Sequence, residues 1–285
     1  MYILEVPYFS LKKTFESGQN LRWIRVNDNK YIVINGDKAL KVEQSKDRII
    51  FDCTEDEVLN SWWEYFDLAL DYSKIYYKIR AVDDDFKVIA NRAKGVHLIK
   101  QNLFETFVSA FFDPEVALDC VDEIARRTGV KHSQSMKEMG IVVWYEFPSP
   151  TTLIRKQNCL NGVNLFGKNE NIIKLAELFA DGWLDEELMR GMECDDVLEY
   201  LDSFEMFSDA EKYTVCVRSL GFKDIMFNDS EFEQAIKSLG FDFDSFCEWY
   251  LSEDKFLANN ASILRYFLLY HYRNKISKIT PEMML

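Results

Sequence analysis

The stretch Ser208-Asp209-Ala210-Glu211-Lys212-Tyr213-Thr214-Val215-Cys216 decides the fold predicted for the second half of this chain. Ser208 and Glu211 have the spacing of a capping box, in which a serine and a glutamate three residues later bind each other's free backbone amides. A helix should therefore begin at Ser208. Lys212 then lies in its first turn, and Cys216, four residues later, is its neighbour on the same helix face.

Asp229 follows this helix, after Gly221 has ended it. A lysine near an apolar helix face, with an acid available from the next segment, is the minimal equipment for amine nucleophile chemistry. The attacking amine must be neutral; burial lowers the pKa of a lysine, and nearby carboxylates raise it. Ordinary roles are open for both residues. Lys212 also fits a surface lysine, and Asp229 also fits the N-cap of a helix over 230–239.

The composition indicates a globular protein without a metal site. The chain has 285 residues, of which 48% are hydrophobic and 15% aromatic, enough for one large or two to three smaller domains. Its six cysteines form no C-x-x-C pair and its three histidines lie far apart, so we expect no metal, no cofactor and reduced thiols. No apolar run is long enough to cross a bilayer and no secretory signal is visible, so we expect no membrane partner. The expected location is the cytoplasm, with nucleoid association if the source is prokaryotic; oligomeric state is not predicted.

The net charge of -14 is unusual for a protein that grips phosphates, because such proteins carry a basic face. A local basic patch remains compatible with this charge, but it must overcome more repulsion. Residues 205–255 hold 12 acidic and 5 basic residues.

The hydrophobic periodicity changes from strand-like to helical near residue 56, which predicts an α+β fold. Asn35-Gly36 is a strong hairpin signal. We expect short strands around Leu21-Trp23-Ile24, Tyr31–Ile34, Ala39–Val42 and Arg48–Phe51. We expect helices over Asp84–Ala93, Asn102–Phe112, Val116–Arg126, Asn169–Ala180, Asp195–Leu201, Ser208–Leu220, Asp229–Leu239 and Asn260–Tyr272. The predicted units are a small β-rich subdomain with flanking helices at 1–95 and a mostly helical region at 96–285.

Several stretches, in chain order, resemble one family. They are Gly18-Gln19-Asn20-Leu21-Arg22-Trp23, Tyr65-Phe66-Asp67-Leu68 with Asp71-Tyr72, Gly95-Val96-His97-Leu98-Ile99-Lys100-Gln101-Asn102, Phe147-Pro148-Ser149, the Lys212 and Cys216 pair, and Asp229. Their order and spacing over nearly the whole chain resemble the 8-oxoguanine DNA glycosylases, which belong to the helix-hairpin-helix superfamily. The resemblance implies a small N-terminal antiparallel sheet beside two helical subdomains, with a degenerate helix-hairpin-helix near 195–220.

The resemblance also implies a base-excision repair enzyme that acts on double-stranded DNA with a damaged purine. Such an enzyme extrudes the damaged base from the stack before it cleaves the glycosidic bond. By resemblance, Lys212 is the nucleophile that forms a Schiff base and nicks the strand by β-elimination, and Asp229 stabilises charge on the sugar. Gly18 offers its carbonyl to the N7 proton of oxidised guanine, and Cys216 packs on one face of the base.

Two parts of the chain depart from the family pattern at the DNA. The family hairpin has G-x-G before the lysine, so that backbone amides can approach a phosphate. This chain instead has Ser208, Asp209, Ala210 and Glu211 as the candidate contacts to the DNA backbone, with two acids and internally capped amides. An asparagine-rich loop that fills the gap left by the base is replaced by Asp113-Pro114-Glu115.

The last helix can be aligned with the family's base-contacting glutamine and aromatic ring in two ways. One alignment places Ser262 and Tyr266 there, and the other places Arg265 and Leu269. We take Arg265 and Tyr266 as the base-binding candidates. Two functions follow from the sequence: a bifunctional DNA glycosylase and AP lyase, or a glycosylase-fold protein that has lost catalysis and acts as a binding module.

Overall fold

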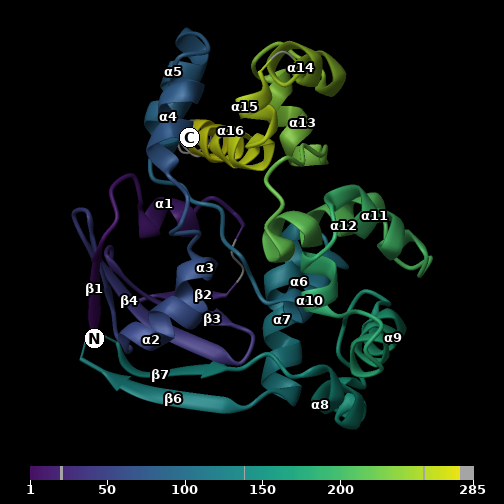
Figure 1. Cartoon of the computed structure of the whole chain (residues 1–285). Helices are drawn as coiled ribbons and strands as arrows, with labels where there is room; N and C mark the ends of the chain where they lie inside the picture. The colour runs from purple at the N-terminus through teal and green to yellow at the C-terminus, as the bar shows by residue number, and fades with distance from the viewer. Residues whose placement is uncertain (20–21, 138, 253, 277–285) are drawn as a thin grey trace, which may run out of the picture.

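The N-terminal part of the computed structural model is an antiparallel sheet (Figure 1). The structure describes residues 1–19, 22–137, 139–252 and 254–276. Five strands form the sheet in the order β1-β5-β4-β3-β2, namely β1 (Tyr2–Glu5), β2 (Trp23–Arg25), β3 (Lys30–Asn35), β4 (Lys38–Ser45) and β5 (Arg48–Phe51).

The hairpin signal at Asn35-Gly36 is confirmed. Asn35 pairs with Lys38, which leaves Gly36 and Asp37 as a two-residue turn between β3 and β4. Gly36 has φ +62°, a value that glycine adopts without steric cost and that tight hairpin turns require. The four predicted strands are present, whereas β1 was not predicted. Leu21, the first residue of the predicted set, lies outside the described residues.

Each face of the sheet buries apolar side chains against a different element. One face packs on α1 (Leu11–Phe15) and on the turns of α2 (Glu55–Glu57), a π-helical segment (Val58–Trp62) and α3 (Trp63–Tyr65). On the other face, Ile32 and Ile34 pack against Val142 of a hairpin made of β6 (Lys131–Met136) and β7 (Gly140–Tyr145). The sequence analysis missed this hairpin.

The rest of the described chain is helical. The helices are α4 (Tyr72–Arg80), α5 (Asp84–Ala93), α6 (Leu103–Ala110), α7 (Pro114–Thr128), α8 (Pro150–Arg155), a 3-10 turn (Gln157–Leu160), α9 (Asn169–Ala180), α10 (Glu186–Arg190), α11 (Cys194–Asp202), α12 (Asp209–Val215), a π-helical turn (Cys216–Leu220), α13 (Ser230–Lys237), α14 (Phe243–Tyr250), α15 (Lys255–Ala258) and α16 (Ala261–Ile276). The predicted α+β class and the eight predicted helices are confirmed.

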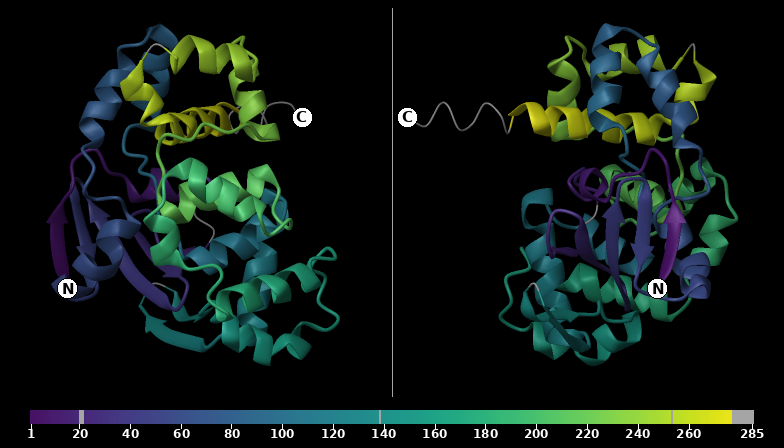
Figure 2. Two further views of the ribbon diagram at one scale, coloured as in Figure 1. Left: turned by 45° about the vertical axis from the view of Figure 1, so that its right-hand side comes forward. Right: turned by 90° about the vertical axis from the view of Figure 1, so that its left-hand side faces the viewer.

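The helices form two groups, one above the other in Figures 1 and 2. The lower group runs from α6 to α12, and the upper group combines α4 and α5 with α13 to α16. α5 packs against α16 and α4 packs against α15, so the chain leaves the sheet, enters the upper group and returns. The predicted boundary at residue 95 differs from this packing, because α4 and α5 precede it yet pack on the C-terminal helices. No helix among the described residues is long and apolar enough to span a membrane.

A buried ion pair joins the sheet to the lower helices. Glu105 of α6 is 6% exposed, and its carboxylate accepts from the backbone N–H of Gly36 at 2.8 Å and from Arg22 Nη1 at 3.1 Å. Arg22, next to β2, is 3% exposed and also pairs with Asp122 of α7 at 3.0 Å. These contacts fix the hairpin turn and the edge strand against α6 and α7, the helices that lead into the site.

We therefore expect Glu105→Ala to destabilise the fold by about 3 kcal/mol, because it removes one ionic partner of a buried arginine and the acceptor of a buried amide. Urea unfolding followed by circular dichroism measures this change. Glu177→Ala, on the exposed face of α9, is the matched control and should change the stability by less than about 0.5 kcal/mol. Equal stabilities of the two variants would contradict the role given to Glu105.

Candidate active site

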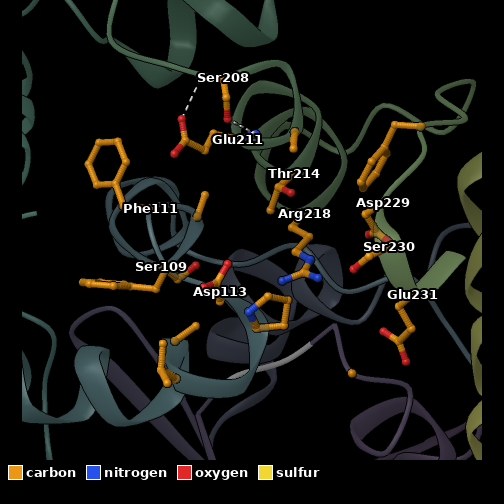
Figure 3. A pocket seen from close by; sticks show the side chains of 18 of the residues that line it. Ser109, Phe111, Asp113, Ser208, Glu211, Thr214, Arg218, Asp229, Ser230 and Glu231 are labelled. Carbon is orange, nitrogen blue, oxygen red and sulfur yellow. Dashed lines mark hydrogen bonds between the residues drawn. The ribbon is translucent and has the colours of Figure 1, made fainter. Parts of the chain in front are cut away.

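A cavity of about 600 Å³ lies where the sheet subdomain and both helical groups meet. Its lining comes from Gly18, from the end of α6 and start of α7, from α12, from the segment before α13, and from α16. Figure 3 shows the side chains that converge on it. Volumes of 300 to 1,000 Å³ are typical of small-molecule sites, so the cavity is large enough for one nucleobase.

Asp229 lies at this cavity and performs two tasks. It is the N-cap of α13, where its Oδ1 accepts from the backbone N–H of Phe232 at 2.8 Å. Its Oδ2 forms an ion pair with Arg265 Nη2 of α16. The Asp229 side chain is 39% exposed, so the carboxylate remains accessible from the cavity. The cap role predicted from sequence is therefore confirmed, and it leaves the carboxylate available for chemistry.

Arg265 and Tyr266 both line the cavity from α16. Arg265 is 1% exposed, its Nε donates to the carbonyl of Phe227 at 3.1 Å, and its guanidinium lies 3.9 Å from the Phe227 ring centroid. Burial lowers the pKa of Arg265, while Tyr266 and Asp229 act in the opposite direction. Ser262, of the other alignment, instead donates to the Ile225 carbonyl at 2.7 Å and is not in the lining.

Leu269 and Arg273 complete the α16 side of the cavity, and Arg273 was not predicted. Arg273 binds Glu231 through Nε at 2.6 Å and Nη2 at 2.5 Å, and its Nη1 donates to the Ser17 carbonyl. The spacing of Arg265, Leu269 and Arg273 at every fourth residue of one helix is the sequence signal that would have identified this face.

Gly18 lines the cavity as predicted, with φ +80°. A Cβ atom at this position would lie 1.5 Å from Arg273 Nη1. The backbone conformation therefore favours glycine, and a side chain at this position would also displace the Arg273 guanidinium. Its predicted role as a carbonyl acceptor for the base stays a prediction.

α12 presents a different face to the cavity from the one that the sequence analysis expected. Glu211, Thr214 and Arg218 follow one helix face and line the cavity, whereas Lys212 and Cys216 do not. Lys212 is 5% exposed, and its Nζ forms ion pairs with Asp202 of α11 and with Asp209 at 2.7 Å. We expected Lys212 and Asp229 to meet at one site. In the structure they do not, because Lys212 faces α11 and not the cavity.

The electrostatics of Lys212 follow from this position. The hydrogen bonds that Lys212 donates to Asp202 and then to Asp209 raise the pKa of Lys212, and burial opposes them. The amine is therefore protonated near neutral pH in this arrangement. Cys216 is fully buried beside Cys194, and the hydrogen bond between the thiols raises the pKa of Cys216. Cys216 is thus on the same side of α12 as Lys212, as predicted, but away from the cavity.

The predicted capping box is present (Figure 3). Glu211 Oε2 accepts from the backbone N–H of Ser208 at 2.6 Å, and the Glu211 N–H donates to Ser208 Oγ at 3.4 Å. Ser208, Ala210 and Glu211 line the cavity, while Asp209 is bound to Lys212. Their predicted contact with the DNA backbone stays a prediction. Among the described residues no group of three or more His, Cys, Asp or Glu side chains could hold a metal ion.

Residues 1–107 match the family model of the 8-oxoguanine DNA glycosylase N-terminal domain. The N-terminal part of this chain is therefore similar to the N-terminal domain of that family. The resemblance seen in the sequence is thereby confirmed for residues 1–107. Among curated proteins, no sequence matches this chain.

Solved glycosylase structures share the fold over nearly the whole chain. MBOgg1, in complex with a low-affinity DNA ligand, is 20% identical with a TM-score of 0.83, covering 96% of this chain and 95% of its own. The Clostridium acetobutylicum 8-oxoguanine glycosylase/lyase, in complex with DNA, is 21% identical with a TM-score of 0.78, covering 95% and 93%. The 3-methyladenine DNA glycosylase of Archaeoglobus fulgidus is 17% identical with a TM-score of 0.73, covering 96% and 99%. The fold is therefore common to enzymes with different damaged bases.

The environment of Lys212 predicts how its charge titrates. Because its folded-state pKa is raised, the ion pairs with Asp202 and Asp209 stabilise the fold below pH ~10.4 and lose this contribution as pH rises through the folded-state pKa. In ¹³C-methylated protein, the NMR signal of Lys212 should titrate above pH ~10.4. Asp202→Asn combined with Asp209→Asn should lower that midpoint, and Glu187→Gln on α10 should not. An unchanged midpoint in the double variant would rule out the carboxylates as the cause.

Proposed function

We propose that this protein is a DNA glycosylase that takes an extruded base into the cavity and cleaves its glycosidic bond with Asp229. The observation that carries the proposal is the placement of the Asp229 carboxylate at a base-sized cavity, fixed by the α13 cap and by Arg265. The proposed partner is double-stranded DNA. The proposed process is base excision repair.

The chemistry requires a fixed negative charge near the sugar. As the bond from C1′ to the base nitrogen breaks, its electron pair leaves with the base and positive charge develops on the sugar ring. The Asp229 carboxylate stabilises that charge and accepts a proton from the water whose oxygen adds to C1′. A proton from solvent completes the released base. Arg265 holds the carboxylate in place, since its guanidinium is bound to the Phe227 carbonyl and packed on the Phe227 ring.

We propose an oxidised purine as the substrate, with 8-oxoguanine the first to test. Support comes from the match of residues 1–107 to the 8-oxoguanine family and from Gly18 at the cavity. The similar Clostridium acetobutylicum protein is named as an 8-oxoguanine glycosylase/lyase, and its DNA holds cytosine opposite 8-oxoguanine. Cytosine is accordingly the opposite base to use.

A lyase step through Lys212 is the second candidate, favoured by the K-x-x-x-C spacing that Lys212 and Cys216 keep. For this step the Lys212 amine must leave Asp202 and Asp209, lose a proton and reach the sugar. Attack of the amine at C1′ would expel the base and form a Schiff base, from which loss of a proton and of the 3′ phosphate nicks the strand. Hydrolysis through Asp229 needs no such rearrangement, and we propose it as the primary activity.

Single-turnover excision on a duplex with 8-oxoguanine opposite cytosine tests the role of Asp229. Asp229→Asn should lower the rate by about 100-fold or more, because it removes the charge that stabilises the sugar. Asparagine is as good an N-cap as aspartate, so α13 keeps its cap. Thermal unfolding of the variant measures the cost of leaving Arg265 without its counter-charge and checks that the protein assayed is folded. Asp244→Asn, in the first turn of α14 and exposed, is the matched control and should keep the full rate. An Asp229→Asn variant as active as the control would refute the proposed role.

Borohydride trapping separates the two chemistries. Excision that leaves an abasic site cut only by alkali, without a trapped adduct, is the result expected for hydrolysis through Asp229. An adduct that is lost in Lys212→Ala would instead establish the lyase step. If no lesion is excised or trapped at low salt, the glycosylase proposal fails and the binding-module reading of the acidic chain is favoured.

A further inference from the structure

Arg218 is a cation in the cavity that forms no ion pair among the described residues, although the Asp113 carboxylate lines the same cavity. The two other arginines of the lining are paired, Arg265 with Asp229 and Arg273 with Glu231. Among the described residues, the Arg218 side chain forms no ion pair, and its one hydrogen bond runs from Nε to Tyr266 Oη at 3.0 Å. Its two terminal amino groups have no protein acceptor there. The side chain is half-buried, and Figure 3 shows the guanidinium turned into the cavity.

The backbone that carries Arg218 is held in an uncommon geometry. Arg218 lies in the π-helical turn Cys216–Leu220, which follows α12 directly. Such turns are frequent at functional sites, because the extra residue re-aims a side chain. The Arg218 carbonyl accepts from the Gln101 N–H at 2.6 Å, and Gly221 ends the turn with φ +81°. The buried hydroxyl of Tyr266, a residue 2% exposed, then fixes Nε, so that the amino groups form a fork directed at the cavity.

We infer that Arg218 is a specificity-determining residue of the proposed glycosylase, which donates hydrogen bonds to a carbonyl-bearing edge of the extruded base and excludes bases made cationic by alkylation. This inference rests on the proposed function and concerns the same cavity. A guanidinium has donors only and no acceptor, so its partner must present oxygen or unprotonated nitrogen. On the major-groove edge of 8-oxoguanine the acceptors are the carbonyl oxygens O6 and O8, because N7 carries a proton, and each can accept from an Arg218 amino group.

Because Arg218 forms no ion pair, its positive charge also discriminates between neutral and cationic bases. A neutral base with carbonyl groups gains hydrogen bonds at Arg218, whereas a purine alkylated on a ring nitrogen brings a positive charge next to an unpaired one. Arg265 and Arg273 cannot act in this way, because Asp229 and Glu231 neutralise them. The other cation of the lining, Lys168, lies 5.9 Å from the Phe111 ring centroid, at a distance typical of a cation–π contact.

A DNA phosphate is the competing ligand for an unpaired arginine. The hydrogen bond from Arg218 to Tyr266 favours the base as the ligand, because Tyr266 is a buried residue of α16 and holds Arg218 within the cavity. The two ligands also differ in a measurable way. Loss of a phosphate contact weakens binding to all DNA alike and reduces the salt slope by about one, whereas loss of a base contact changes the ratio between bases.

Binding to cleavage-resistant duplexes tests the inference separately from catalysis. Three duplexes carry 2′-fluoro nucleotides with guanine, 8-oxoguanine or 7-methylguanine at one position, and their affinities are measured by fluorescence anisotropy at several salt concentrations. The full-length wild-type chain should prefer 8-oxoguanine over cationic 7-methylguanine. Arg218→Met should reduce this preference by about 10- to 100-fold. Arg218→Lys, which keeps the charge and loses the fork, should retain the rejection of 7-methylguanine and weaken binding of 8-oxoguanine.

Lys174→Met is the matched control, since it removes an exposed cation of α9 outside the cavity, and it should leave the preference unchanged. Thermal unfolding checks that each variant is folded. The inference is overturned if Arg218→Met keeps the preference for 8-oxoguanine. It is also overturned if this variant loses affinity for all three duplexes alike, with a salt slope smaller by about one. Neither outcome contradicts the proposed function, which the excision assay tests. A preference that depends on Arg218 in a chain without excision supports the inference and sinks the proposed function. A wild-type chain that binds all three duplexes equally overturns the inference as well.

Discussion

The contact between the Asp229 carboxylate and the buried guanidinium of Arg265 is the constraint on which the site depends. Arg265 is 1% exposed and needs a counter-charge, and Asp229 supplies it while it caps α13. One interaction therefore fixes the start of α13 and the rotation of α16. The rotation of α16 in turn decides where Tyr266 holds Arg218 and where Arg273 meets Gly18. Removal of either side chain would leave the other charged group without its counter-charge in a partly buried site.

Charge in this chain is arranged locally, which reconciles a net charge of -14 with the site that we propose for DNA. Three of the four acids that line the cavity are bound: Glu231 by Arg273, Asp229 by Arg265, and Glu211 by the Ser208 amide. The Asp113 carboxylate forms no hydrogen bond or ion pair among the described residues. Arg218 is the exception among the arginines there, which makes the cavity more favourable to an electron-rich ligand than the composition indicates. The capping box has the opposite effect at the hairpin, because it occupies amides that a phosphate would otherwise bind.

Features with local causes could be predicted from the sequence. The Asn35-Gly36 turn, the caps at Ser208 and Asp229 and the span Asn169–Ala180 all follow from neighbouring residues, and the structure has each of them. The N-terminal family motifs gave the sheet and the helical groups correctly. The hairpin of β6 and β7 was missed although its strands alternate, because polar residues dominate β6.

The rotation of α12 could not be predicted, since it depends on contacts far away in sequence. The spacing of Lys212 and Cys216 predicted correctly that they share a side of the helix. Which side meets the cavity is decided by packing on α11, where Asp202 and Cys194 bind them. The pairs Glu231 with Arg273 and Tyr266 with Arg218 join residues more than 40 positions apart. Pattern reasoning along one helix cannot identify such partners.

A crystal structure of the Asp229→Asn variant bound to a duplex with 8-oxoguanine opposite cytosine tests the central claim most directly. The account predicts that the damaged base lies outside the stack, in the cavity between α12 and α16, with a carbonyl oxygen about 2.9 Å from an Arg218 amino group and its sugar beside residue 229. DNA bound on another face, or a base that stays stacked in the duplex, would contradict it.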